Sequence, residues 1–95
     1  MQQTEEFEQW FERLRDGIAQ KRIAARIARI EIGLFGDVKP VGGKVSELRI
    51  DHGPGYRVYF TRVGETIILL LVGGDKSMQE RDIEKAKELA AQIDD

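Results

Sequence analysis

The sequence predicts a single α+β domain over residues 1–95, with helices covering one face of a small sheet. Helical spacing of apolar residues in the first third, alternation of apolar and polar residues in the middle, and helical spacing again at the end predict this class. The chain can bury about two-thirds of its unfolded surface, enough for one modest core. We therefore expect an N-terminal αα-hairpin, a small antiparallel β-meander of three strands and a C-terminal helix.

Two amphipathic helices are expected first. Thr4 is followed by acids, as is typical of a helix N-cap, and Asp16-Gly17 separates this helix from a second one over residues 18–32. The apolar faces consist of Phe7, Trp10, Phe11 and Leu14 in the first helix, and of Ile23, Ile27 and Ile30 in the second. Arg22, Arg26 and Arg29 repeat the second spacing one residue earlier, and so form a basic ridge beside the apolar stripe.

The middle of the chain is typical of strands and turns. Residues 33–44 contain four glycines and Pro40, which predicts a loop. Residues 45–51 and 56–62 alternate between two faces, and the turn sequence His52-Gly53-Pro54-Gly55 separates them. Residues 67–72 are apolar on both faces, which indicates a central strand that Gly73-Gly74 ends.

The last helix is expected to begin at a capping box. Ser77 and Glu80 have the S-x-x-E spacing in which each side chain satisfies a backbone N–H group of the other. The buried stripe of this helix consists of Ile83, Ala86, Ala90 and Ile93.

Composition excludes several classes of protein. The chain has no cysteine and one histidine, so a thiolate metal site, a disulfide framework and a multi-histidine metal site are excluded. No apolar run approaches the roughly 20 residues that cross a bilayer, and the acidic start is unlike a secretion signal. We expect a cytoplasmic protein with no membrane contact.

The net charge of −2 conceals a basic centre. Residues 13–62 carry a formal charge of +6, whereas residues 1–12 and 63–95 carry −4 each. Because polyanions respond to local potential, this central block is a candidate phosphate-facing surface. The alternative is that these bases only keep the helices soluble.

A set of cations on the strands is the strongest candidate site. Arg49 and Arg57 lie on the two arms of one hairpin, and Tyr59 shares the side of Arg57. If the apolar faces pack on the helices, these groups lie on the open side of the sheet, and Lys76 follows the next strand. Such a set would bind phosphate and could stabilise the transition state of RNA cleavage. Alternatively, Glu47 and Asp51 pair with the two arginines as cross-strand salt bridges.

Five sequence blocks stand out together: G-D-V-K-P-V-G at 36–42, V-S-E-L-R-I at 45–50, G-P-G-Y-R-V-Y-F at 53–60, L-L-L at 69–71 and G-G-D-K-S at 73–77. These blocks resemble HigB-type addiction-module killer proteins of the RelE/ParE toxin superfamily. They follow the family's order over nearly the whole chain. The resemblance implies a RelE-like fold and the toxin of a type II toxin–antitoxin system.

The resemblance also implies an activity, a site and partners. RelE-like members are metal-independent endoribonucleases that cut mRNA on the ribosome by attack of the 2′-hydroxyl. The matching site residues would be Arg49, Arg57 and Lys76, with Tyr59 and His52 as weaker candidates for proton transfer. The implied partner is a helix-turn-helix, HigA-like antitoxin, and no cofactor is implied. The predicted RNA-facing residues are Lys39, Lys44, Arg22, Arg26 and His52.

Two departures and two alternatives accompany this resemblance. Family members begin with a short strand, whereas only three residues precede Thr4 here. That strand is expected to be shortened or absent, unless the start site is misplaced. The C-terminal Tyr or His that some members use for acid–base chemistry has no equivalent, since Gln79, Asp82 and Ile83 occupy that region. The alternatives are a ParE-like toxin that inhibits DNA gyrase and an inactive antitoxin-binding module.

Overall fold

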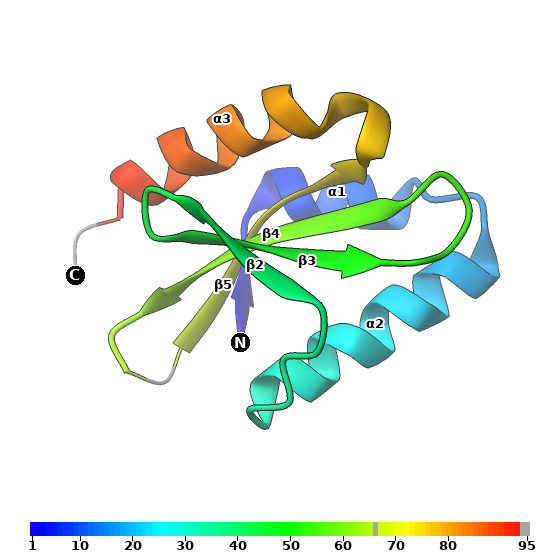
Figure 1. Ribbon diagram of the computed structural model, residues 1–95, viewed down its shortest axis with the longest axis horizontal. Helices are drawn as coiled ribbons and strands as arrows, with labels where there is room; N and C mark the ends of the chain where they lie inside the picture. Colours follow the sequence, from blue (N-terminus) through cyan, green and yellow to red (C-terminus); the bar gives the residue numbers. More distant parts are fainter. Residues whose placement is uncertain (66, 94–95) are drawn as a thin grey trace.

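The computed structural model describes residues 1–65 and 67–93, which contain five strands and three α-helices (Figure 1). In chain order the elements are β1 (Gln2–Gln3), α1 (Glu5–Glu12), α2 (Gly17–Glu31), β2 (Val38–Gly42), β3 (Val45–Ile50), β4 (Tyr56–Val63), β5 (Ile67–Asp75), the 3₁₀ helix η1 (Lys76–Met78) and α3 (Gln79–Ala91). The strands form one sheet in the order β1-β5-β4-β3-β2. The pair β1–β5 is parallel and the other pairs are antiparallel, so the sheet is mixed.

The predicted fold, a RelE-like arrangement of an N-terminal αα-hairpin before a three-stranded antiparallel meander, is wrong. The sheet has five strands, one of which precedes the helices and pairs in parallel. The three predicted strands do occur as β3, β4 and β5, but they are the middle of a larger sheet. Both additional strands lack the alternation of β3 and β4 and the apolar run of β5.

The N-terminal strand is short but present. Gln2 and Gln3 pair with Leu69 and Leu70 of β5. Thr4 then binds the same strand twice, through its N–H to the carbonyl of Leu70 (2.9 Å) and through its hydroxyl to the carbonyl of Leu71 (2.6 Å). Its hydroxyl also accepts the N–H of Phe7, as predicted for an N-cap. Thr4 therefore fixes the start of α1 on the sheet.

The segment predicted as a loop contains the other edge strand. Within residues 33–44, β2 pairs with β3 from Val38↔Leu48 to Gly42↔Val45, with an irregularity after Pro40. Pro40 has no N–H and Gly42 has a φ of +95°, so the segment carries the sequence signals of a loop. Pro40 is tolerated because an edge strand need not donate outward.

Helices cover both faces of the sheet, not one face as predicted. On one face α1 and α2 bury a core against β3, β4 and β5, made of Phe7, Ile23, Ile27, Ile30, Leu48, Ile50, Val58, Phe60, Ile68 and Leu70. On the other face α3 packs through Ala86 against Val45, Tyr59, Leu71 and Val72. This explains why β5 is apolar on both sides. No helix in residues 1–65 and 67–93 combines the length and apolar character that crossing a membrane requires.

The C-terminal helix does not begin at the predicted capping box. β5 continues through Gly73-Gly74 to Asp75, whose side chain accepts the N–H of Ser77 and caps η1. The Ser77 hydroxyl also donates to Asp75 and so does not cap a helix. α3 begins at Gln79 with no side-chain cap. Both glycines lie within β5, where the lack of a side chain leaves room for Trp10 of α1 over Gly73 and for Asp82 of α3 over Gly74.

The two glycines of β5 provide a test of this packing. A Cβ at Gly73 would overlap the ring of Trp10 of α1, whereas a Cβ at Gly17, the first residue of α2, would meet nothing within 4 Å. We expect Gly73→Ala to lower the free energy of unfolding by about 1–3 kcal/mol, the usual cost of overpacking. Gly17→Ala should be neutral or stabilising by about 0.4–1 kcal/mol. Urea denaturation of both variants measures the difference, and equal stabilities would contradict the packing of α1 on β5.

Candidate functional site

A cavity of about 410 Å³ lies beside the β3–β4 hairpin and its turn. Three cations line it from three elements: Arg49 of β3, Arg57 of β4 and Lys76 of η1. The rest of the wall consists of Asp37, Ile50, Asp51, Gly53, Pro54 and Gly55. The structure therefore brings together the three cations singled out in the sequence.

The sheet register places the two arginines face to face. Arg49 and Arg57 are direct partners in the antiparallel β3–β4 pair. Like charges opposite one another destabilise a sheet unless a counter-charge lies between them. Glu47 supplies that charge, since its Oε1 accepts a hydrogen bond from Arg49 Nε (3.0 Å) and lies 3.9 Å from Arg57 Nε.

Glu47 is completely buried and its second oxygen is also hydrogen-bonded. The Tyr59 hydroxyl (3.1 Å) and the Gln79 amide (2.8 Å) both donate to Oε2. Burial alone would raise the pKa of Glu47, but hydrogen bonds from Gln79, Arg49 and Tyr59 outweigh burial and hold this pKa below its ordinary value. The carboxylate is therefore charged and fixes both arginines from behind the cavity.

The competing interpretation of the arginines is salt bridging by Glu47 and Asp51. For Glu47 the structure contains an ion pair with Arg49 on its own strand and a longer one, at 3.9 Å, with Arg57 across the strands. This pairing does not remove the cations from the surface, because the Arg49 side chain is still 35% exposed. Arg57 is more enclosed, and its Nε is buried without a hydrogen-bond acceptor among the described residues. Asp51 forms no salt bridge within the described part of the chain. Arg49 therefore forms its ion pair with Glu47 and still lines the cavity.

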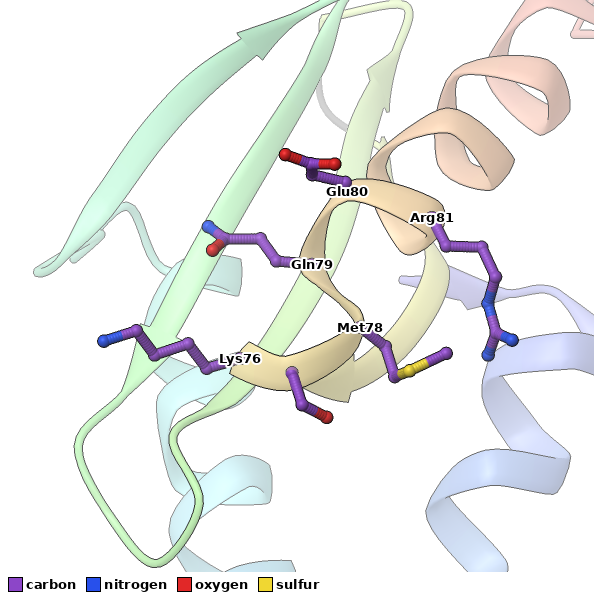
Figure 2. Close-up of a pocket in the computed structure, with 6 residues that line it drawn as sticks. Lys76, Met78, Gln79, Glu80 and Arg81 are labelled. Carbon is purple, nitrogen blue, oxygen red and sulfur yellow. The ribbon is translucent and has the colours of Figure 1, made fainter.

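Lys76 reaches the cavity because two glycines let neighbouring segments approach closely. Gly55, in the hairpin turn, has a φ of +83°, and a Cβ there would lie 3.4 Å from Arg57 Nη1 and 3.5 Å from Lys76 Cβ. A Cβ at Gly74 would collide with the Asp82 carboxylate of α3. Figure 2 shows Lys76 and Gln79 extending toward the strands, while Met78 and Arg81 point to the opposite side. These six residues, Lys76 to Arg81, line a hollow of about 460 Å³ that shares Lys76 with the cavity.

Tyr59 does not lie on an open face as predicted. Its strand position is on the side of Arg57, but α3 covers that part of the sheet and leaves the Tyr59 side chain fully buried. Burial and the adjacent Glu47 raise the pKa of Tyr59 above its ordinary value. The phenol supports Glu47 and is not positioned to transfer a proton in the cavity.

His52 has a partner that the sequence did not reveal. Its Nε2 lies 2.9 Å from Asp16 Oδ2, and its ring stacks on Tyr56 at 6.5 Å. The other oxygen of Asp16 accepts two N–H groups of α2. The hydrogen bond with His52 and those from the helix hold the pKa of Asp16 below its ordinary value. The ring thus binds the hairpin turn to α2 on the helix side of the sheet, away from the cations.

The other predicted RNA-facing residues are dispersed. Lys39 is exposed on edge strand β2. Lys44, with a φ of +63°, lines a small separate hollow with Thr61 and Ala90. Arg22 and Arg26 line a cavity of about 300 Å³ on α2 with Arg29, Ala25, Ile50 and Asp51. In residues 1–65 and 67–93 no three His, Cys, Asp or Glu side chains are grouped as metal ligands would be.

A protein of Haemophilus influenzae (strain ATCC 51907 / DSM 11121 / KW20 / Rd), described as "Uncharacterized protein", is 46% identical over 87 residues, which cover 92% of this chain and 88% of the relative. The chain belongs to the family of this Haemophilus protein. No family model matches the chain, and no solved structure matches it. The function of this family therefore has to be inferred from the site itself.

The role of Glu47 can be tested by removing its charge. Glu47→Gln leaves Arg49 and Arg57 opposed without a counter-charge, and we expect it to lower the free energy of unfolding at neutral pH by about 1–3 kcal/mol. Because the folded pKa is lowered, this stabilisation is present above the ordinary value of 4.5 and is lost as the pH falls through the folded pKa. The variant and the wild type should therefore converge in acid. Denaturant titrations over pH check this, with the exposed Glu84→Gln as control, and a difference that persists in acid would contradict it.

Proposed function

We propose that the chain is the toxin of a type II toxin–antitoxin system, a metal-independent endoribonuclease that cleaves mRNA on the ribosome. One observation carries the proposal: Arg49, Arg57 and Lys76, from three separate elements, line a single cavity. Arginines bind phosphate oxygens with paired N–H groups, and several cations on one concave surface match the charge of a phosphodiester.

The position of the resembling sequence blocks supports the proposal. The blocks at 45–50 and 53–60, which resemble HigB-type toxins, correspond to β3 and to the turn and beginning of β4. The block at 73–77 ends β5 and includes Lys76. These segments build the cavity, so the resemblance coincides with the candidate site as well as with the core.

In the proposed reaction the 2′-hydroxyl of one nucleotide attacks the adjacent phosphorus. The P–O5′ bond breaks, leaving a 2′,3′-cyclic phosphate and a 5′-hydroxyl. The 2′-oxygen loses a proton and the 5′-oxygen gains one. Negative charge grows on the phosphate oxygens in the transition state, where fixed cations stabilise it most. Arg49, Arg57 and Lys76 have this role, and Glu47 holds the two arginines in place.

The proposal includes partners and a location. The substrate is mRNA bound to the ribosome, the inhibitor is a helix-turn-helix, HigA-like antitoxin, and the site of action is the cytoplasm. Induced expression followed by primer extension on mRNA tests this, and cuts phased with codons are expected. DNA breaks with an SOS response would instead indicate a ParE-like gyrase inhibitor. Absence of both effects would indicate an inactive antitoxin-binding module, and either result would overturn the proposal.

Substitution of Arg57 is the most direct test of this function. Arg57→Ala removes a guanidinium from the cavity, and we expect it to lower the cleavage rate by about 100-fold or more and to relieve growth arrest. Lys85→Ala removes an exposed cation from α3, outside the cavity, and should leave both unchanged. Circular dichroism and antitoxin binding verify that the Arg57 variant is folded. A folded Arg57→Ala protein that remains fully toxic would contradict the site.

A further inference from the structure

A second basic cavity adjoins the first and is not explained by cleavage alone. It is the 300 Å³ cavity on α2, where three arginines face a single acid, Asp51. Arg22, Arg26 and Arg29 are four and three positions apart, so they project from one face of the helix. Like charges at this spacing destabilise a helix, and none of the three forms a salt bridge with any described residue. Asp51 is therefore the single acid beside three arginines, and it forms an ion pair with none of them.

Arg26 connects α2 to β3. Its Nη1 donates to the backbone carbonyl of Arg49 (3.0 Å), which binds the second cavity to the strand that carries the first. Its Nη2 is buried and has no acceptor within the described part of the chain. A Cβ at Gly36 would lie 2.9 Å from this nitrogen, so Nη2 is enclosed against the loop before β2. Arg22 and Arg29 are the exposed cations of this cavity.

The two cavities share part of their lining. Ile50 and Asp51 line both of them. A strand of RNA that occupied both cavities would therefore pass beside these two residues. The exposed Asp51 carboxylate at this boundary repels phosphate, so phosphates are favoured on either side of it and not over it.

We propose that the Arg22–Arg26–Arg29 cavity is a second phosphate subsite, which binds a neighbouring phosphate of the same single-stranded RNA whose scissile phosphate lies beside Arg49. The inference rests on the proposed function and adds to it a path for the strand, from the hairpin to α2. It also adds Arg29 to the RNA-binding residues.

The test compares ligands with one and with several phosphates. The probes are fluorescently labelled 2′-O-methyl oligoribonucleotides, a dinucleotide and an octanucleotide, which cannot be cut by 2′-hydroxyl attack. We expect the double variant Arg22→Gln/Arg29→Gln to bind the octanucleotide about tenfold more weakly and the dinucleotide as the wild type does. The dependence of log K on log salt should become shallower by about 0.7 for each phosphate that the variant no longer neutralises.

The control is Lys21→Gln/Lys85→Gln, which removes the same charge from exposed positions outside both cavities. It should keep octanucleotide affinity, and an equal weakening in this control would overturn the subsite in favour of general charge attraction. Asp51→Asn should tighten octanucleotide binding, and weaker binding would overturn the path across Asp51.

Two results separate this inference from the proposed function. If the wild type binds both oligonucleotides and cleaves mRNA but the arginine double variant binds normally, the subsite is wrong and the proposed function stands. The same holds if that variant loses only its affinity for ribosomes, since the arginines would then contact a different RNA. If the wild type binds neither oligonucleotide and cleaves no mRNA, both proposals fail.

Discussion

The candidate site depends on one buried carboxylate. The register of β3 and β4 places Arg49 directly opposite Arg57, an arrangement that is unfavourable without an anion between them. Glu47 lies under both, is completely buried and has hydrogen-bonding partners on both oxygens. Removing a carboxylate from water is costly, and here four side chains from β3, β4 and α3 compensate for it. The site is thus held by an ion pair between Glu47, which is buried in the core, and Arg49, which is partly exposed at the surface.

Burial and periodicity explain which parts of the fold could be predicted. The alternation in β3 and β4 and the helical spacing of α1 and α2 are strong signals, because each element has one buried face. β1 is two glutamines and β2 contains Pro40 and Gly42, so neither has a pattern that marks a strand. Their pairing is imposed by neighbours: β5 holds one and β3 the other. Tertiary contacts, and not local propensity, make these two segments strands.

The site was predictable to the extent that it follows from strand geometry. Alternation alone placed Arg49 and Arg57 on one face, and Lys76 followed from its place after the last strand. Alternation could not show that α3 covers Tyr59, because that depends on how far the helix reaches along the sheet. The partnership of His52 with Asp16 joins residues 36 positions apart, and that of Gln79 with Glu47 joins residues 32 positions apart. Neither pairing can be recognised from the residues that are adjacent in the sequence.

The parallel pairing of β1 with β5 also constrains the order of events during synthesis. The Thr4 hydroxyl is bonded to a carbonyl 67 positions later, so α1 cannot dock before nearly all of the sheet has been translated. Until then Phe7 and Trp10 have no partner strand to cover them. Contacts between such distant positions form late, because a long loop must close first. A nascent chain therefore reaches its finished shape only when its final strand has emerged from the ribosome.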